Sequence, residues 1–539
     1  GYIVFFFNDI ARRGAQVQPW EVWLGIMTII LVLEGGRRVV GKVLPTLGIL
    51  FLLYCYFGRY MPEMFMHRGY SINRIIQHMY LTQEGIFGVA LGVSSTFVFM
   101  FILFGAFLNR SGGTRLFNEL ALALAGQSPG GPAKVAIVAS GMLGTINGSS
   151  VANVATTGAF TIPLMKKVGY KPEFAGAVEA CASTGGQFMP PIMGAGAFIM
   201  SEFLGISYLR IAAAAIIPAV LYYTALFSAV HIRARRRDLK GLPEEMLPNL
   251  KSVLLKDGHL LIPLVVIVAM LLYKFTPLAA AFWGIISVVF ISMLKSHTRM
   301  DLKTILKAME EGARSALGVA LACALVGFIV GTSSLTALGL TISNNIIDIA
   351  GGRLFLTLLL GMVACLVLGM GLPTTANYIV TSTMIAPALI KMGVFPLAAH
   401  LFVFYFGIMA DLTPPVCLAA FTGAGIAGAS PSSTGFQATQ IALVAYLIPY
   451  TFIYTPMILL EGTGWLFLIL VVASLCGVIA LAAALQGWMY RNLGSAARIV
   501  FMVAGFAAFW PDYWVKSVAV IAIITSFFIL KKGRNPSSL

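Results

Sequence analysis

Long apolar segments follow one another along the 539 residues of this chain, separated by short polar or glycine-rich connections. About 20 apolar residues are enough for a helix to cross a bilayer. Continuous apolar runs, rather than alternating ones, favour a helical bundle over an outer-membrane barrel. The segments that we expect to cross are 22–34, 43–58, 85–108, 173–204, 209–230, 258–273, 277–294, 314–331, 396–424, 437–459, 464–486 and 513–530.

Two further apolar segments are each interrupted by a polar stretch. NGSSVAN (147–153) divides segment 133–165, and GLPTTAN (371–377) divides segment 353–390. The halves can enter a membrane but are too short to cross it comfortably. We therefore predict two re-entrant helical hairpins, each with a polar tip near the middle of the membrane.

Composition agrees with a polytopic membrane protein, because 59% of the residues are hydrophobic and only 10% are charged. The net charge of +16 could suggest nucleic acid, but the basic residues cluster at helix ends and in the loop HIRARRRDLK (231–240). Membrane topology explains this distribution, so no nucleic-acid partner is expected. The chain opens with GYIVFFFND and no Met, and we expect the start of the full product to be absent.

Motifs for other kinds of chemistry are missing from the sequence. The six cysteines form no CxxC, and no HExxH, GxxxxGK[ST] or GxSxG occurs. These absences argue against a zinc site, ATP-driven transport by this chain and a hydrolase elbow. We expect no cofactor, and a membrane-embedded enzyme is the weaker alternative.

An internal repeat relates the two interrupted segments. Residues 147–172 align with 371–396 without a gap, at a constant shift of 224. Five crossings separate the two hairpins, and an odd number reverses direction, so the repeats are predicted to be inverted, as in many secondary transporters. The matching pairs are Asn153 with Asn377, Pro163 with Pro387, Lys167 with Lys391, Gly169 with Gly393, Pro172 with Pro396, Pro190 with Pro414 and Pro191 with Pro415.

The segment after each hairpin carries a Pro-Pro pair. Pro190-Pro191 follows Gly185-Gly186 inside 173–204, and Pro414-Pro415 lies beside Asp411 inside 396–424. Proline removes a backbone donor, so both helices should break there, and the freed backbone groups need protein, water or ions as partners. Asp411 is the most informative charge, because a carboxylate within an apolar span is costly unless it binds a cation or a proton. Glu179 and Glu202 are weaker candidates.

Several motifs resemble the large permease of tripartite ATP-independent periplasmic (TRAP) transporters. They are GTINGSSVANVATTGAFTIPLMKKVGY, EACASTGGQFMPPIMGAGAF, GMGLPTTANYIV and ADLTPPV. Over about 20–490 the chain resembles, more narrowly, a fused permease of the TAXI class. The resemblance implies that 1–60 are the remnant of a small-permease portion, cut at its N-terminus. It implies a large-permease core over 61–490, with repeats at about 85–230 and 314–460, and extra helices of unassigned role over 491–539.

The same resemblance implies an all-α, inverted-repeat, elevator-type transporter of the inner membrane. It would take an organic acid from a soluble extracytoplasmic TAXI-type binding protein and move it with an ion gradient, usually Na⁺. The cation residues implied are Ser149, Ser150, Asn153 and the backbone of Gly186 and Gln187 at one site, and Thr374, Thr375, Asn377, Asp411 and Thr413 at the other. The substrate residues expected are Asn147, Ser149, Ser150, Pro190, Pro191, Thr374, Thr375, Pro414 and Pro415.

The residues themselves leave the coupling ion open. Hydroxyl, amide and carbonyl oxygens with at most one carboxylate suit a monovalent cation, since a divalent ion would want more carboxylates. Asp411 could instead carry a proton. A passive channel and a binding-protein-independent proton symporter are the remaining alternatives.

Overall fold

The computed structural model describes residues 1–460 and 464–532. Almost all of this part of the chain is helical, which confirms the predicted all-α class. The exception is a small antiparallel pair, β1 (Trp488–Met489) and β2 (Arg491–Asn492). Among the described residues, 8 helices are long and apolar enough to cross a membrane. The protein is therefore a polytopic membrane protein.

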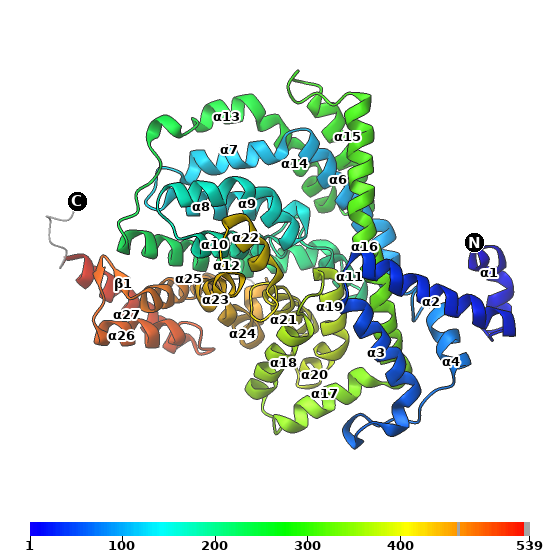
Figure 1. Ribbon diagram of the computed structural model, residues 1–539. Helices are drawn as coiled ribbons and strands as arrows, with labels where there is room; N and C mark the ends of the chain where they lie inside the picture. Colours follow the sequence, from blue (N-terminus) through cyan, green and yellow to red (C-terminus); the bar gives the residue numbers. More distant parts are fainter. Residues whose placement is uncertain (461–463, 533–539) are drawn as a thin grey trace.

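One side of the molecule, on the right in Figure 1, contains the N-terminal helices and the 35-residue helix α16 (Leu302–Thr336). Helix α16 contacts α2, α3 and α6 and extends well beyond the predicted span 314–331. Its polar start is held by an ion pair between Glu311 and Arg110 of α6. The other helices of this region are α1 (Tyr2–Arg12), α2 (Pro19–Val39), α3 (Val43–Phe57), α4 (Ile72–Ile76), α5 (Val89–Val93), α6 (Phe99–Arg110), α14 (Ile262–Leu272) and α15 (Pro277–Ser292). Helix α13 (Leu250–Asp257) lies apart from them, at the upper left of Figure 1.

The two repeats form the centre of the molecule (Figure 1). The first contains α7 (Gly113–Ala125), α8 (Gly131–Asn147), α9 (Ser150–Lys167), α10 (Pro172–Gly186), α11 (Gly196–Leu204) and α12 (Tyr208–Arg236). The second contains α17 (Leu338–Ile349), α18 (Leu354–Leu368), α19 (Thr374–Met384), α20 (Ala386–Lys391), α21 (Pro396–Met409), α22 (Leu418–Ala427), α23 (Pro431–Ala442) and α24 (Ile448–Tyr454). At the predicted shift of 224, α9 and α19 begin at equivalent residues, and so do α10 and α21. The helix boundaries therefore follow the sequence repeat.

Both predicted hairpins are present. Helices α8 and α9 join at Gly148, whose φ of 61° is a left-handed conformation that glycine adopts readily, and Ser149 caps α9 by accepting a bond from the Ala152 amide at 3.4 Å. In the second repeat, Gly371 has a φ of 72° and Pro373 precedes the first residue of α19. In each case a glycine reverses the chain where the polar stretch interrupts the apolar segment.

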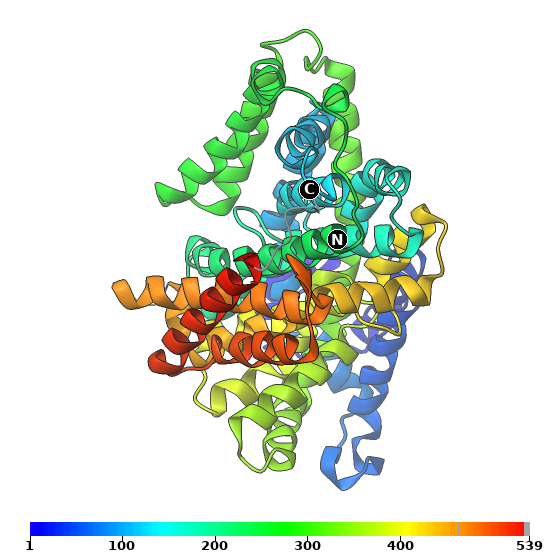
Figure 2. The same ribbon diagram turned by 90° about the vertical axis from the view of Figure 1, so that its left-hand side faces the viewer.

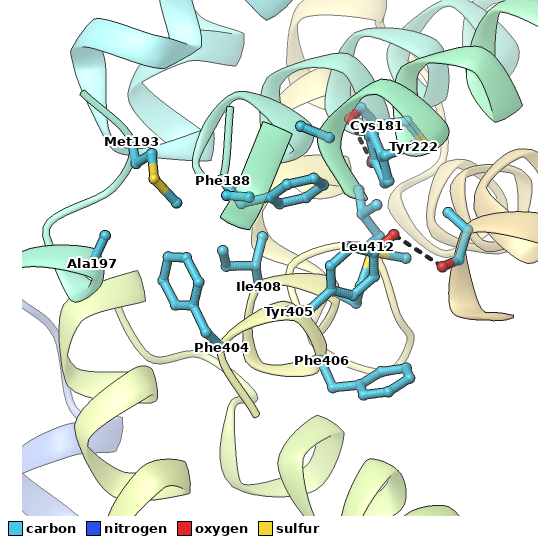
Figure 3. Close-up of a cluster of buried hydrophobic side chains, with 14 of the residues drawn as sticks. Cys181, Phe188, Met193, Ala197, Tyr222, Phe404, Tyr405, Phe406, Ile408 and Leu412 are labelled. Carbon is cyan, nitrogen blue, oxygen red and sulfur yellow. Dashed lines mark hydrogen bonds between the residues drawn. The ribbon is translucent and has the colours of Figure 1, made fainter. Parts of the chain in front are cut away.

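Both predicted helix breaks are present as well. A non-helical connection that contains Pro190 and Pro191 separates α10 from α11, and another that contains Pro414 and Pro415 separates α21 from α22. Figure 3 shows the aromatic cluster between them. Phe188 lies with its ring centroid 5.0 Å from Tyr222 and 4.9 Å from Tyr405. Part of the buried core thus lies where the two breaks approach each other.

Some elements differ from the expected segments. The span 437–459 is divided into α23, a 3-10 turn and α24, because Pro449 starts a new helix. Helices α7 and α17 were not predicted, since both are short and amphipathic, with polar residues such as Glu119 and Asp348. The short 3-10 or π segments are η1 (Gly58–Tyr60), η2 (Glu63–Phe65), η3 (Gln77–Leu81), η4 (Ser94–Val98), η5 (Glu244–Met246), η6 (Gly258–Leu261), η7 (Leu443–Leu447) and η8 (Pro456–Leu459).

The C-terminal helices α25 (Trp465–Gln486), α26 (Ser495–Ala507) and α27 (Tyr513–Lys532) pack on one another and, through α25, on α12. They lie at the opposite end of the molecule from the N-terminus, in the foreground of Figure 2. They are therefore attached to the first repeat and not to the N-terminal helices.

The two repeats are joined by a close crossing of α10 and α22. A Cβ atom on Gly423 would lie 2.5 Å from the backbone oxygen of Gly176, whereas a Cβ on Gly425 of the same helix would meet open space. We expect Gly423→Ala to destabilise the protein by about 1–3 kcal/mol, since the backbones must separate. Gly425→Ala should be neutral or slightly stabilising. Thermal unfolding of the two detergent-solubilised variants tests this difference, and equal midpoints would contradict it.

Candidate functional site

A cavity of about 250 Å³ lies between the two hairpin tips. The first tip contributes Asn147 to Val151, and the second contributes Gly371 to Thr375. The breaks add Ile192, Met193, Ala195, Asp411 and Leu418, and helices α6, α16 and their neighbours add Val40, Val98, Phe101, Ile102 and Val319. The polar tips therefore face one shared space that also borders the N-terminal helices.

Four side chains around this cavity form a reciprocal set across the repeats. Ser150 Oγ of the first tip donates to Asp411 Oδ2 of the second break at 2.6 Å. The equivalent residue of the second tip, Thr374, donates to Gln187 Oε1 of the first break. Gln187 Nε2 also donates to Asp411 Oδ2 at 3.4 Å, and these two residues are 224 apart, the spacing of the repeat. The four residues thus obey the pseudo-twofold relation predicted from the sequence.

The side-chain hydrogen bonds of the two tips can be set beside the two expected cation sites. Ser150 was expected with Gly186 and Gln187, and Thr374 with Asp411. The structure places Ser150 on Asp411 and Thr374 on Gln187, so these side-chain contacts run between the repeats.

The two equivalent asparagines keep to their own repeats. Asn153 Nδ2 donates to the backbone oxygen of Ser140 at 2.8 Å, and Asn377 Nδ2 donates to the backbone oxygen of Gly407 at 2.5 Å. Within the described residues, both Oδ1 atoms are buried and have no hydrogen-bond partner. A buried amide oxygen without a partner costs about 1–3 kcal/mol, and a cation would satisfy it. The observation is the same in both repeats.

Glycines pack closely against both asparagine side chains, where any larger residue would collide with them. A Cβ atom on Gly369 or Gly407 would lie 2.9 or 2.8 Å from Asn377 Oδ1, and a Cβ on Gly144 would lie 2.9 Å from Asn153 Nδ2 and 2.7 Å from Gly186 Cα. The side chains that line the cavity between the tips offer amide and hydroxyl oxygens, and among the described residues Asp411 is the only carboxylate in that lining. This donor set fits a monovalent hard cation such as Na⁺ better than a divalent one.

The other expected site residues divide into two groups. Asn147, Ser149 and Thr375 line the cavity between the tips. Thr413 points elsewhere, because its hydroxyl contacts the Met409 oxygen at 2.8 Å and Tyr446 Oη at 2.6 Å.

The four prolines also lie away from the tip cavity. Pro190 and Pro191 line a separate, mostly apolar cavity of about 730 Å³, and Pro414 and Pro415 are absent from the lining of the tip cavity. The prolines break the helices, and their neighbours Met193 and Asp411 reach the tips.

Two polar side chains matter more than the sequence indicated. Gln187 was expected to contribute only its backbone, yet its side chain joins Thr374 to Asp411. Its equivalence to Asp411 at the shift of 224 was a signal that could have identified it. Glu179, a weaker candidate, is completely buried and accepts hydrogen bonds from four hydroxyl groups.

Comparison with known proteins places this arrangement in a family. The chain is 25% identical over 375 residues to the C4-dicarboxylate TRAP transporter large permease of Pseudomonas aeruginosa, covering 68% of this chain and 85% of that protein. It is 26% identical over 335 residues to the sialic acid TRAP transporter large permease of Vibrio cholerae, covering 60% and 74%. It is 25% identical over 344 residues to an isethionate TRAP transporter permease of Oleidesulfovibrio alaskensis, covering 61% and 52%.

A family model described as "Tripartite ATP-independent periplasmic transporter, DctM component" matches residues 27–467. This range includes both hairpins and both breaks and ends shortly after α25 begins. The chain therefore belongs to the DctM family of TRAP transporter large permeases, and it is a multi-pass transport protein of the inner membrane and not an enzyme.

Proposed function

We propose that this chain is a TAXI-class permease that takes up an organic acid by Na⁺-driven secondary transport. TRAP permeases work with extracytoplasmic substrate-binding proteins, and the partner proposed here is a soluble TAXI-type binding protein. The observation that carries the proposal is the pair of hairpin tips that enclose one cavity, each beside a buried asparagine oxygen that has no partner in the part of the chain that the structure describes. A site built twice, in equivalent positions, supports two bound cations next to one substrate.

The charge around the cavity supports co-transport of a cation with an acid. Asp411 is the only charged residue in its lining among residues 1–460 and 464–532, and it would repel a carboxylate substrate on its own. Na⁺ bound at the asparagine oxygens would reverse this repulsion. The N-termini of α9 and α19, at the two tips, add favourable dipoles for an anion. Substrate and Na⁺ would thus bind more tightly together than separately, as coupling requires.

The cavity also supports an elevator movement, because its walls come from two groups of helices. The hairpins and breaks of α8–α11 and α18–α22 supply one wall, and Val40, Val98 and Val319 from α6, α16 and their neighbours supply the other. We propose that the repeats move as one body against the N-terminal helices and α14–α16. Helices α25–α27 would travel with the repeats, since α25 packs on α12.

Reconstitution into liposomes tests the proposed function. A TAXI-type binding protein loaded with its radiolabelled organic acid is added outside, with an inward Na⁺ gradient, an inward proton gradient or neither. We expect accumulation only with the binding protein and the Na⁺ gradient. Flux that needs neither, at channel-like rates, would overturn the transporter proposal in favour of a passive channel. Accumulation driven by the proton gradient without the binding protein would identify a proton symporter.

A further inference from the structure

A buried carboxyl group lies in the first repeat, outside the cavity between the tips. Glu179 of α10 is 0% exposed. Ser140 Oγ of α8 donates to its Oε1 at 2.5 Å, Thr161 Oγ1 of α9 donates to its Oε2 at 2.5 Å, and Ser183 Oγ donates to Oε1 at 3.2 Å. Thr157 of α9 also contacts Oε1. We call these five residues the Glu179 cluster, and none of the four partners carries a charge.

The hydrogen atoms available in the cluster point to a protonated carboxyl group. Three of the hydroxyl groups make further contacts. Ser140 Oγ lies 2.8 Å from Thr157 Oγ1. Thr157 Oγ1 lies 2.8 Å from the backbone oxygen of Asn153, and Thr161 Oγ1 lies 3.1 Å from the backbone oxygen of Thr157. The four hydroxyl groups carry only four hydrogen atoms, which are fewer than the contacts among them, with the backbone and with the carboxyl oxygens. A proton on Glu179 supplies a fifth. It also removes the cost of an unpaired charge in the interior of a membrane protein.

The same distances disfavour a metal ion inside the cluster. The oxygens of Glu179 lie 2.5 Å from hydroxyl oxygens on two different helices, which is direct hydrogen-bonding contact. A Na⁺ ion coordinated by these oxygens would have to lie between them and push them apart. The carboxyl oxygens of Glu179 are thus engaged by the hydroxyl groups of the cluster, an arrangement that accommodates a proton without separating them.

The cluster is connected to the candidate cation site of the first repeat. Ser140 accepts a hydrogen bond from Asn153 Nδ2 through its backbone oxygen, and Thr157 donates to the Asn153 backbone oxygen. Asn153 is the residue whose Oδ1 has no partner among the described residues. Ser140 and Thr157 thus each contact both Glu179 and Asn153, so a single residue lies between the carboxyl group and the residue that carries this oxygen.

The second repeat has no such cluster. At the shift of 224, Glu179 corresponds to Val403, Ser140 to Ala364, Thr161 to Ile385 and Ser183 to Gly407. Only Thr157 keeps its chemistry, as Thr381, which donates to the Asn377 oxygen at 2.8 Å. The second repeat thus forms the same helices with a valine in place of the glutamate. The fold of a repeat therefore does not require a carboxyl group at this position.

We infer that Glu179 and its four hydroxyl partners form a proton-binding site linked to Na⁺ at Asn153. Na⁺ at Asn153 favours the ionised carboxylate nearby, so Na⁺ binding releases the Glu179 proton to solvent, and Na⁺ release restores it. The linkage rests on the proposed Na⁺ site, whereas protonation of Glu179 does not. The sign follows directly: Na⁺ should bind more tightly as the pH rises.

The helices that pack against α10 carry other titratable groups. Tyr223 of α12 faces Glu179 and donates to the Ala182 oxygen at 2.9 Å. The sequences of α22 and α23 contain no titratable side chain. The remaining groups are Cys181 and Glu173 on α10, Lys134 in the first turn of α8, Lys166 and Lys167 in the last turn of α9, Cys417 and Asp411 before α22, and Tyr208, Arg210, Tyr222, His231, Arg233, Arg235 and Arg236 of α12.

Infrared spectroscopy of the purified whole chain tests protonation without any transport. We expect Glu179→Gln to lose a carbonyl-stretch band of a protonated carboxylic acid that the parent and Asp411→Asn both retain. Thr161→Val keeps the carboxyl group but removes the donor to Oε2, so it should shift the frequency of that band. If Glu179→Gln does not fold, this shift carries the test. A band unchanged by either substitution at position 179 or 161 would overturn the inference.

Proton release on adding NaCl tests the linkage, with the protein in weakly buffered detergent solution, a pH indicator and choline chloride as the comparison. We expect release from the parent and at least a fivefold smaller signal from Glu179→Gln. Equal release from both, or loss of release only in Asp411→Asn, would overturn the assignment to Glu179. If the parent retains the infrared band but neither binds Na⁺ nor releases protons, the Na⁺ part of the proposed function and the linkage fail, and the protonated Glu179 stands.

Discussion

Asp411→Asn should abolish gradient-driven accumulation while the protein still inserts and folds. Among the described residues, Asp411 is the only charged one that lines the cavity between the tips, and it links the second repeat to Ser150 and Gln187 of the first. Asparagine has the same shape and keeps one acceptor oxygen for Ser150. The substitution therefore removes the negative charge that attracts the coupling cation and changes little else.

The expected size of this effect follows from burial. A carboxylate that attracts a cation in a low-dielectric site contributes several kcal/mol, and every 1.4 kcal/mol is tenfold in affinity. Binding of the coupling ion should therefore fall by orders of magnitude. Accumulation in liposomes should drop to the level measured without a gradient.

Asp348→Asn is the matched control, since Asp348 is an exposed carboxylate on α17 of the same repeat. It should transport at the parental rate. Size-exclusion profiles of both variants check folding. Coupled uptake by a well-folded Asp411→Asn protein at the parental level would remove Asp411 from the mechanism.

The hairpins and breaks could be predicted because each depends on local chemistry. A glycine with positive φ reverses the chain at Gly148 and Gly371, and a Pro-Pro pair lies in the non-helical connection after α10 and after α21. The fixed shift of 224 then predicted which residues are equivalent, and the reciprocal contacts of Ser150 and Thr374 follow that relation.

The choice of partner across the cavity could not be predicted in the same way. A repeat states that two tips are equivalent, but it does not state which break each tip approaches, because this depends on how the repeats pack. Thr413 illustrates the limit, since its position beside Asp411 suggested the site and its hydroxyl instead contacts Tyr446. Likewise, the hydrogen bonds of Glu179 come from hydroxyl groups on three helices, and no spacing in the sequence indicates that these groups meet.

Short amphipathic helices were missed for a different reason. Helices α7 and α17 lie at equivalent places in the two repeats, immediately before each hairpin, but a search for long apolar runs excludes them. The sequence repeat was a signal that could have indicated them, because the last residue of α7, Ala125, is equivalent to the last residue of α17, Ile349. Each hairpin is thus preceded by a helix too polar to cross as a membrane span.

Asn153→Ala and Asn377→Ala should each weaken Na⁺ binding by about tenfold, which corresponds to ~1.4 kcal/mol. Both variants remove a buried oxygen that has no partner among the described residues, and both also remove a hydrogen bond to a backbone oxygen. Because the two residues occupy equivalent places in different repeats, the double variant should combine both losses. Thermal stabilisation by NaCl relative to choline chloride measures the binding directly, since a ligand that binds only the folded state raises its midpoint.

Thr156→Ala is the matched control for this pair. Thr156 lies on α9 one turn after Ala152, is exposed, and donates only to the Ala152 oxygen of its own helix in the described structure. It should keep the parental response to NaCl. Loss of the backbone hydrogen bonds alone would lower the midpoints of the asparagine variants equally in NaCl and in choline chloride. Cation binding at Oδ1 instead predicts that the difference between the two salts shrinks, and an unchanged difference in both single variants would show that the tips do not hold the cation through these oxygens.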